Sequence, residues 1–505
     1  MEWKEGYVIG IEYVHGVHRE LGPSALNLVL LIQGKEPVEL QGGFTYCDLG
    51  CGQGESVNFF AACHPEGEFH AIDFNSAHIA GARDLADRAD LGNATFWESS
   101  FAELGKLPLP EFDFIVIHGV YSWVGADTRC SIVEFLRDKL KPGGVVYLSY
   151  NSLPGWSTHA PLRQLLFSYA ETQSGPLKQR IDLAIEFVER LKTAHAAVFE
   201  ASPAIGSFFE YICTLPRNYL AHEFFNRDWT PFYHAEVVKD LAAAKLSFSG
   251  PANFAENHDI FRFSEAHQQL MDSVTDQVMR ESVKDFAVNP LLRRDLFTHG
   301  RPGINPLLQQ EHLLKCRFAL IVPQQKLERK ALLPIGEAAL DRELYDPILL
   351  ALELKPHSME ELLQRPEIGA LGMARVRLAL IVLLSAEYVM PAVEPAYPAV
   401  MTTRRLNSVL LEREIDNMEP RFLASPALQS AIKVDWLERL LILCEIDRNP
   451  DPLSFIWEKM AEHHHKLSRD GVILQSEEGN LAELAVQIES FRTFRLSMLR
   501  QLGVL

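Results

Sequence analysis

The segment from Tyr46 to Ser56, YCDLGCGQGES, constrains the fold of this chain more than any other, because three glycines stand at alternate positions directly after a short apolar run. Gly50, Gly52 and Gly54 lack a Cβ, so the backbone can turn sharply there and a ligand can approach the peptide groups closely. A helix is predicted to start near Glu55. The segment therefore predicts a strand, a glycine-rich turn and a helix in succession, as in the nucleotide-binding α/β folds.

Two ligands compete for this turn. Asp73 ends a second apolar run, Phe69 to Ile72, about 20 positions after the glycines, where an acidic residue holds a ribose in dinucleotide-binding proteins. Their fingerprint is GxGxxG, however, whereas here the third glycine comes one residue early and Asp48 precedes the first glycine by two. This pattern resembles the D/E-x-G-x-G-x-G motif of class I S-adenosylmethionine (SAM) methyltransferases. A glycine turn without a ligand is the third interpretation, and the surrounding pattern of strands and helices argues against it.

Between Phe44 and Asn151 apolar strands alternate with helical patterns. This rhythm predicts a mostly parallel sheet with helices on both faces, a Rossmann-like α/β core whose ligand lies at the carboxyl ends of the strands. Helices are predicted over Ser76–Asp90 and Thr128–Leu140. The predicted strands are Thr45–Leu49, Phe69–Asp73, Ala94–Glu98, Phe112–His118 and Gly144–Ser149.

At 505 residues the chain is long enough for about three domains. We predict a helical lead-in over residues 1–40, with Ser24 as an N-cap, and the core over 41–165. A mostly helical middle or regulatory domain would cover 166–325. A C-terminal domain, winged-helix-like and helical, would cover 326–505; its three helical segments are Leu344–Leu354, Met359–Gln364 and Ala370–Ser385.

Two predicted strand ends carry the residues that we expect to act on the substrate. FDFIVIHG ends at His118 and Gly119 and continues into HGVYSWV, and the last strand runs into SYNSLPGW. The rings there would line a channel that attracts a cationic amine or sulfonium, although they could instead pack a domain junction. The predicted catalytic residues are His118, Tyr121, Trp123, Tyr150, Asn151 and Trp156.

The remaining cofactor contacts are predicted after the third strand, where a polar group commonly meets adenine and an apolar group covers its ring. The segment there contains Ser99, Ser100 and Phe101, and the role is predicted more firmly for the segment than for one residue. The predicted SAM-binding residues are Asp48, Gly50, Gly52, Gly54, Asp73, Phe74, Ser100, Phe101, His118 and Gly119.

Composition excludes several classes of function. Acidic residues exceed basic ones and give a net charge of −19, which argues against nucleic acid as a partner and favours lysine-rich protein segments. We find no secretory signal and no apolar run long enough to span a membrane, so a cytoplasmic protein is expected. The seven cysteines are widely spaced, HEFFN lacks the second histidine of HExxH, and His463–His465 point to different faces of a helix. No metal site is predicted.

Taken together, DLGCGQG, AIDFN, FDFIVIHGVYSWV, LKPGGVVYLSYNSLPGW, YLAHEFFN and NPLLRRDLFTHG resemble the bacterial SAM-dependent methyltransferases that carry a methyltransferase regulatory domain. That group includes the rickettsial-type protein lysine methyltransferases. The resemblance covers most of the chain and implies SAM as the cofactor, a lysine-bearing protein as the acceptor, and a homodimer. The segment GYVIGIEYVHGVHREL departs from the proline-rich start of those enzymes, which puts the acceptor in question.

Three functions follow from these observations. The first is a protein lysine methyltransferase, favoured by the large accessory region. The second is an O- or N-methyltransferase that acts on a small molecule or glycan, for which His118 is the candidate base. The third is a non-catalytic SAM-binding regulator.

Overall fold

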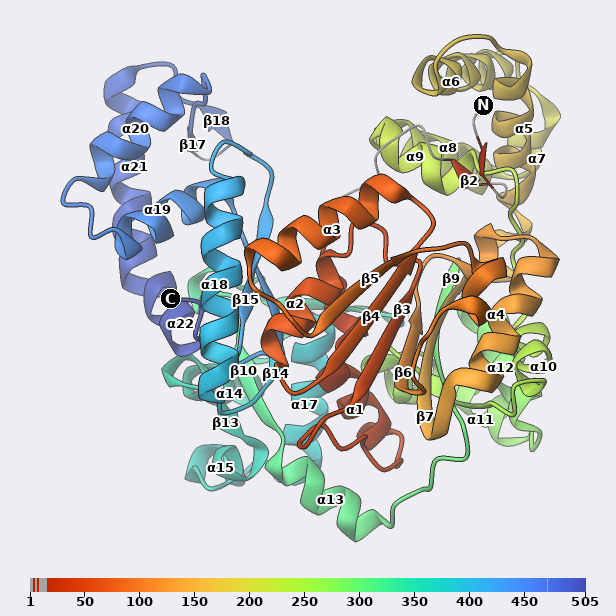
Figure 1. The fold of residues 1–505 in the computed structure, drawn as a ribbon, viewed down its shortest axis with the longest axis horizontal. Coiled ribbons are helices and arrows are strands. Elements are labelled where there is room, and N and C mark those ends of the chain that lie inside the picture. Colours follow the sequence, from red (N-terminus) through yellow and green to blue (C-terminus); the bar gives the residue numbers. More distant parts are fainter. Residues whose placement is uncertain (1–2, 5–6, 9–15, 470) are drawn as a thin grey trace.

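A seven-stranded sheet forms the centre of the protein (Figure 1). The structure is a computed structural model that describes residues 3–4, 7–8, 16–469 and 471–505. The strand order is β5-β4-β3-β6-β7-β9-β8; the first five strands are parallel, and β9 pairs antiparallel with both β7 and β8. The strands are β3 (Thr45–Leu49), β4 (Glu68–Asp73), β5 (Ala94–Glu98), β6 (Phe112–Ile117), β7 (Leu140–Asn151), β8 (Ser247–Pro251) and β9 (Leu292–Thr298).

Helices cover both faces of this sheet, as predicted. Side chains alternate along a strand, so that Tyr46 joins the core on one face and its neighbour Cys47 joins the core on the other. The first face packs against α1 (Pro23–Ile32), α2 (Glu55–Cys63) and α3 (Ser76–Arg88). The second packs against α4 (Ala126–Lys139) and α10 (His234–Ala242). The Rossmann-like core is therefore confirmed.

The five predicted strands all exist, but β8 and β9 were not predicted. Both come from the segment after residue 165, so the sheet takes strands from the region predicted as the middle domain. Strand β7 also begins four residues earlier than predicted, at Leu140. The domain boundaries themselves stay a prediction.

The predicted N-cap at Ser24 is wrong. Helix α1 has Gly22 as its N-cap and Pro23 in its first turn, where the missing N–H of proline leaves no bond unmade. The Ser24 hydroxyl instead donates to Gln429 Oε1 at 2.5 Å. The described parts of the lead-in also contain two short strands, β1 (Trp3–Lys4) and β2 (Tyr7–Val8), so it is not helical throughout.

A separate helical lobe follows the core strand β7. Its apolar centre includes Trp156, Leu166, Phe209 and Phe224 and is distinct from the two cores of the sheet. The lobe consists of α5 (Ala160–Thr172), α6 (Leu177–Thr193), α7 (Ala197–Ala201), α8 (Pro203–Thr214) and α9 (Arg217–Phe224). The middle region ends with α11 (Glu265–Asp272), α12 (Gln277–Val288) and α13 (Pro306–Lys315).

The C-terminal region has its own large apolar core. A three-stranded sheet in the order β13-β10-β14 packs with α14, α15 and α17, the three helices that the sequence predicted. A winged helix would continue from β14 into a further strand, whereas here β10 supplies the third strand from earlier in the chain. The winged-helix interpretation is not confirmed. The elements are β10 (Arg317–Leu320), β11 (Lys330–Leu333), β12 (Gly336–Ala339), α14 (Arg342–Leu354), β13 (His357–Ser358), α15 (Met359–Leu363), α16 (Pro366–Gly369), α17 (Met373–Ser385) and β14 (Val389–Ala392).

The last hundred residues are mostly helical, as predicted. They comprise α18 (Tyr397–Arg413), the hairpin β15 (Arg421–Ser425) and β16 (Ser430–Val434), α19 (Trp436–Ile446), α20 (Pro452–Glu462), β17 (Ser468–Arg469), β18 (Val472–Ile473), α21 (Glu477–Ser490) and α22 (Leu496–Gln501). Helix α18 packs against α2 of the core, so this region is joined to the α1–α3 side of the core sheet.

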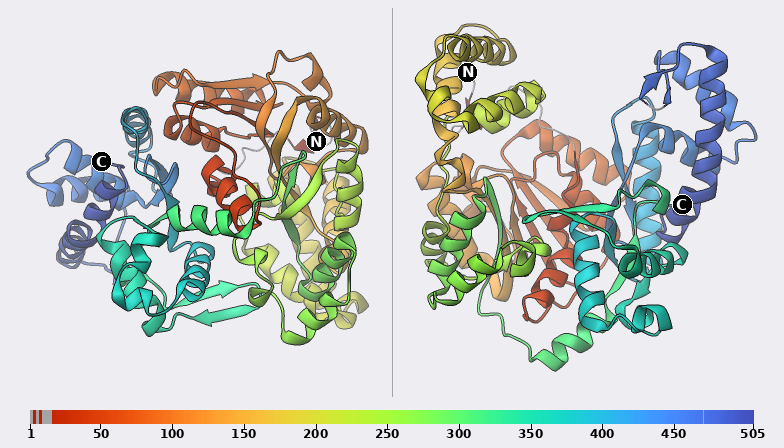
Figure 2. Two further views of the ribbon diagram at one scale, coloured as in Figure 1. Left: turned by 90° about the horizontal axis from the view of Figure 1, so that it is seen from below. Right: turned by 180° about the vertical axis from the view of Figure 1, so that it is seen from behind.

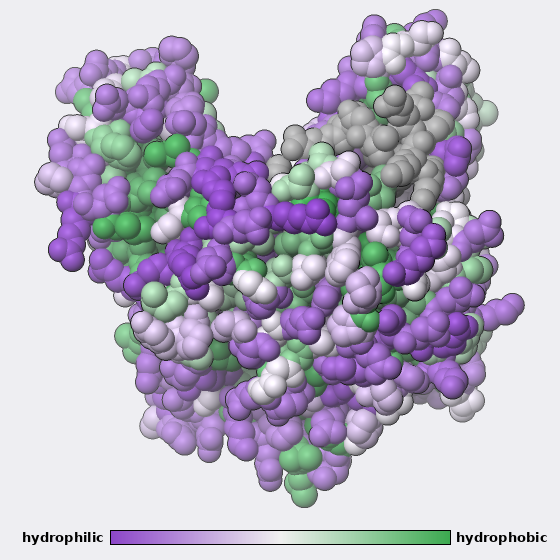
Figure 3. Space-filling view, viewed as in Figure 1, coloured by the Kyte–Doolittle hydropathy of each residue, from purple (hydrophilic) through white to green (hydrophobic). Residues whose placement is uncertain are grey.

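Two lobes rise on either side of the sheet, the α5–α9 lobe and the lobe of α19–α21, and both views of Figure 2 separate them. The surface is hollowed between them on the face seen in Figure 3. Among the described helices, none has both the length and the apolar character that crossing a bilayer requires.

Candidate active site

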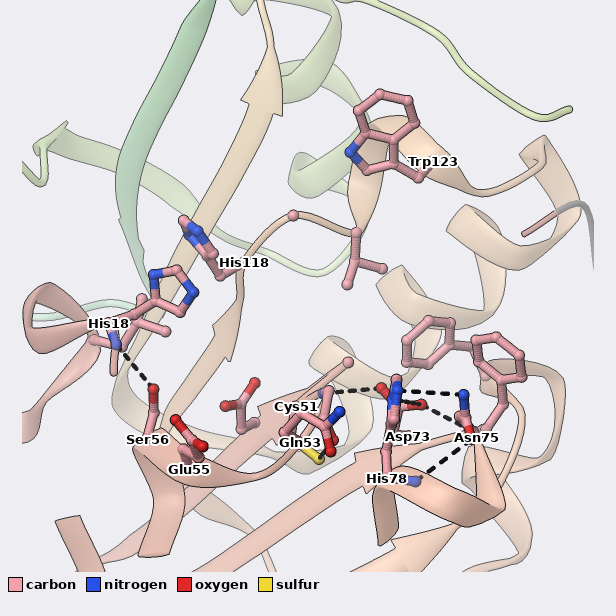
Figure 4. A pocket seen from close by; sticks show the side chains of 18 of the residues that line it. His18, Cys51, Gln53, Glu55, Ser56, Asp73, Asn75, His78, His118 and Trp123 are labelled. Atoms are coloured by element: carbon pink, nitrogen blue, oxygen red, sulfur yellow. Dashed lines mark hydrogen bonds and ion pairs between the residues drawn. The ribbon is translucent and has the colours of Figure 1, made fainter. Parts of the chain in front are cut away.

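A pocket opens at the carboxyl ends of β3, β4 and β6 (Figure 4), the edge at which parallel α/β sheets bind their ligands. The structure brings most of the predicted cofactor residues together there. Those that line the pocket are Asp48, Gly50, Gly52, Asp73, Phe74, Phe101, His118 and Gly119, together with the predicted channel residue Trp123.

The glycine turn has the backbone shape that the sequence predicted. Gly50 and Gly52 have φ values of +86° and +54°, in the region that favours glycine. The Gly50 and Cys51 N–H groups donate to Ile72 O at 2.8 and 3.1 Å, which ties the turn to the end of β4. A Cβ on Gly50 would lie 2.3 Å from Val120 Cγ2, so the turn and the segment after β6 pack too closely for a side chain.

Gly54 belongs to the same motif but serves another purpose. It is the N-cap of α2 with φ +66°, and it lies outside the pocket lining. An added Cβ would lie 2.6 Å from Ala82 Cβ and 2.8 Å from the Phe96 ring. Gly54 therefore lets α2 approach α3 and β5, and a direct contact with the cofactor stays a prediction.

Asp73 is held in place by two backbone groups. Its Oδ2 accepts from Gly52 N–H at 2.9 Å and its Oδ1 accepts from Asn75 N–H at 2.9 Å. The Asn75 side chain in turn caps α3. The carboxylate thus connects the glycine turn to the start of α3, with both oxygens at the pocket end of β4.

The pocket is acidic. Asp48, Glu55 and Asp73 line it, and no lysine or arginine is among its lining residues in the described part of the chain. Burial, and then the nearby Asp73, raise the pKa of Asp48 to about 7. A cationic ligand would relieve this repulsion, and Phe74, Phe101 and Val120 offer apolar surface for a ring. These residues fit SAM, which carries an ammonium, a sulfonium, ribose hydroxyls and adenine.

Two histidines bound the other end of the pocket. The rings of His18 and His118 have centroids 4.3 Å apart, and His118 Nδ1 lies 3.1 Å from the Tyr147 hydroxyl. The backbone N–H of His18 donates to Ser56 Oγ at 3.0 Å. Burial lowers the pKa of His18 and holds the pKa of His118 well below its ordinary value. Both imidazoles are therefore neutral at neutral pH. Sequence reasoning missed His18, since no motif surrounds it.

His18, Glu20 and His118 bring potential ligand atoms within 4.8 Å of one another, so they could hold a metal ion that the sequence did not predict. His463 makes a second, more exposed group with Asp416 and Glu462. Exposed acidic residues commonly gather in this way without binding a metal, and neither group by itself carries a functional conclusion.

The other predicted channel residues lie behind the pocket. The Tyr121 hydroxyl donates to Asp240 at 3.0 Å, and the Trp156 indole donates to the Leu291 carbonyl at 2.9 Å. The Tyr150 hydroxyl donates to Asp295 at 2.7 Å. These side chains are buried, and neither they nor Asn151 line the described part of the pocket. Their predicted role in methyl transfer stays a prediction.

At the adenine side, Ser99 rather than Ser100 lines the pocket. Ser100 is the N-cap of the 3₁₀ turn Phe101–Lys106, and its carbonyl accepts from the Ser99 hydroxyl and from Glu103 N–H. The predicted segment therefore lies at the pocket, but Ser99 lines it in place of the predicted Ser100. The lining residues that the sequence did not single out are Gly16, His18, Leu21, Cys51, Gln53, Glu55, Ser56, Asn75, His78, Val120 and Val124.

Comparison with known proteins agrees with this fold. Residues 47–146 match the model of a methyltransferase domain, and residues 216–299 match that of a predicted methyltransferase regulatory domain. An uncharacterised protein of Synechocystis sp. is 38% identical over 509 residues, which span 100% of both chains. The structure of PKMT2 from Rickettsia typhi in complex with AdoHcy is similar in fold, with a TM-score of 0.68 and 20% identity over 95% of this chain and 98% of that chain.

The sheet order, the glycine turn and the family match define a class I SAM-dependent methyltransferase. Within that class, the chain belongs to the family that couples the methyltransferase domain to a methyltransferase regulatory domain, and it shares this family with its full-length Synechocystis relative.

Proposed function

We propose that this protein transfers methyl groups from SAM to lysine side chains of a protein acceptor. The observation that carries the proposal is the lining of one acidic pocket by Trp123 and by the neutral imidazole of His118. An indole face attracts a cationic amine. The His118 imidazole can accept a hydrogen bond from the lysine amine, but its lowered pKa makes it a weak proton acceptor. Burial of the lysine side chain in the pocket would itself favour the neutral amine by desolvation.

Several residues would hold the cofactor. The Asp73 carboxylate would accept hydrogen bonds from the ribose hydroxyls, the turn at Gly50 and Gly52 would face the methionine part, and Phe74 and Phe101 would flank the adenine. When bound, SAM supplies an electrophilic methyl group. The protein then has to align the nucleophile and exclude water.

The surroundings of the pocket support a macromolecular acceptor. Asp228 lies beside Gly125, next to the lining residue Val124, so that a further carboxylate stands near the pocket. The fold shared with PKMT2 of Rickettsia typhi points in the same direction.

A methyltransferase acting on a small molecule or glycan is the second candidate, because the neutral His118 could equally accept a hydrogen bond from a hydroxyl group. A homodimer is proposed as for the resembling enzymes.

Incubation of the purified protein with methyl-labelled SAM and whole lysate tests the proposal. We expect label in protein, at lysine, and its loss with His118→Asn while SAM binding persists. Label confined to small molecules or glycans would establish the second candidate instead, and no label in either fraction would leave a SAM-binding regulator. Treating the wild-type protein with EDTA tests whether His118 acts directly on the acceptor or binds a metal ion. Activity that is lost with EDTA and restored by a divalent cation would assign His118 to a metal site.

A further inference from the structure

Trp229, which lies in the region matched by the regulatory domain, contacts the wall of the pocket. Its ring centroid is 6.4 Å from that of Trp123, which lines the pocket, and 5.0 Å from that of Trp156 in the helical lobe. Three indoles therefore run from the pocket to the lobe. The sequence singled out the first and the last of them, and the structure adds the middle one.

The segment that carries Trp229 is fixed to the core by backbone hydrogen bonds. Thr230 N–H donates to Ser122 O at 2.8 Å, and Phe232 N–H donates to Asn151 O at 2.9 Å. The Leu153 N–H returns to Phe232 O at 2.9 Å. The segment thus continues the pairing pattern at the end of β7, so its position relative to Trp123 is set by the same backbone network as the core.

A buried arginine supports the ring from the lobe. The Arg163 guanidinium lies 4.5 Å from the centroid of Trp229, and its Nη2 donates to Asn226 O at 2.5 Å. Arg163 is 3% exposed, which makes this cation–π contact one of the few interactions that compensate its burial. The indole is therefore held on a defined side, which suits a wall that a ligand must meet in one orientation.

Two buried donors in this group have no hydrogen-bond partner among the described residues, the Trp229 Nε1–H and the Asn151 Nδ2–H₂. Asn151 adjoins the Trp123 turn, because its backbone N–H donates to Ser122 Oγ at 2.8 Å. Both donors are enclosed by protein and neither residue lines the pocket, so Trp229 meets Trp123 from behind the pocket wall.

We propose that Trp229 is a positioning residue, which holds the Trp123 indole in the orientation that meets the methyl acceptor at the pocket wall. This inference rests on the proposed function. It gives the matched regulatory region a part in acceptor binding through its contact with Trp123.

The test compares poly-L-lysine with free L-lysine as methyl acceptors. Trp229→Phe keeps a ring against Trp123, so we expect its KM for poly-L-lysine to stay near the wild-type value. Trp229→Ala removes that support and should raise KM about 10-fold for both acceptors, since both need the Trp123 wall. AdoHcy affinity should stay unchanged in both variants. Trp457→Phe, in α20 of the C-terminal region, is the matched control.

The inference would be wrong if Trp229→Ala kept the wild-type KM for the acceptor. It would also be wrong if Trp229→Ala lost AdoHcy affinity by the same factor by which its KM for the acceptor rose. If wild-type protein labels no lysine but labels a small molecule, the proposed function fails by itself. In that case an unchanged KM for that molecule in Trp229→Ala would reject the positioning role of Trp229, and a raised KM would retain that role. Trp229→Leu fills part of the volume without a ring, so the test survives if the alanine variant fails to fold.

Discussion

The pocket has two halves that differ in how they are built. The half that we propose for the methyl donor consists of the glycine turn, Asp48 and Asp73, which lie within one βαβ unit of the chain. The half that we propose for the acceptor combines His18, the Trp123 turn and, by our inference, Trp229, which are contributed by three separate parts of the sequence. A short stretch of chain can define a cofactor site by itself, whereas the acceptor site exists only once distant segments have packed together.

The largest expected effect tests whether every glycine of the motif belongs to the donor half. Gly54→Ala should lower the free energy of unfolding by about 2–4 kcal/mol, because the new methyl group would meet Ala82 and Phe96 in a backbone conformation that disfavours a side chain. Thermal and denaturant unfolding measure this change. In the matched control, Gly81→Ala in α3, the methyl group meets nothing within 4 Å and should be neutral or stabilising. An undiminished stability of Gly54→Ala together with lost SAM binding would return Gly54 to the cofactor site.

The next effect should be confined to the donor half. Asp73→Ala removes the carboxylate that accepts from Gly52 and Asn75 and that would hold the ribose, so SAM affinity should fall about 100-fold, or about 2.7 kcal/mol. Calorimetry gives the affinity, and the exposed Asp84→Ala on α3 is the control. The separation of the two halves would be wrong if Asp73→Ala changed KM for the acceptor while SAM bound normally.

The acidity of the donor half predicts a pH dependence. Because the pKa of Asp48 in the free protein is about 7, the carboxyl loses its proton as pH rises through 7, and only the ionised form attracts a cation. SAM affinity should therefore increase from pH 6 to pH 8 by up to about 10-fold, the factor set by the one-unit gap between pH 6 and this pKa. Asp48→Asn should lose that increase. SAM titrates as well, but its titration affects the wild type and Asp48→Asn equally, so the two proteins are compared at each pH. Identical pH profiles of SAM affinity would contradict the prediction.

The smallest effect concerns residues behind the acceptor half. Tyr150→Phe removes the hydroxyl that donates to Asp295 and also lies 3.1 Å from His234 Nδ1, and should lower stability by about 1–2 kcal/mol. If Tyr150 only supports the end of β7, KM and kcat should change little. If Tyr150 instead lines the acceptor channel, as the sequence predicts, Tyr150→Phe should clearly lose methyl transfer while its AdoHcy affinity stays unchanged. Tyr169→Phe in α5, away from the pocket, controls for the loss of a phenol.

The donor half was predictable because its chemistry is local. Alternating apolar segments predicted β3 to β7 within a few residues, and the spacing of Asp48, the glycines and Asp73 indicated SAM. The prediction from sequence failed where a contact joins residues that are far apart along the chain. β8 and β9 were missed because they are short strands separated from the core by the helical lobe, and their pairing with β7 is a tertiary property.

The aromatic residues after β6 and β7 show the same limit. Trp123, Tyr150 and Trp156 look alike in the sequence as rings at strand ends, yet only Trp123 lines the described pocket. Tyr150 and Trp156 turn toward Asp295 and Leu291, partners more than a hundred positions away. Periodicity indicates which side of an element a residue occupies, but it does not indicate which distant segment will cover it.

The sequence by itself determined the class of fold, the cofactor and the shape of the glycine turn, because backbone conformation and charge spacing in one continuous segment decide them. The tertiary structure alone decided that His18 faces His118, that Gly54 supports helix packing, and that Trp229 stands against Trp123. These relations depend on burial and on contacts between segments far apart in the chain, which acquire a defined geometry only when the sheet and its lobes assemble.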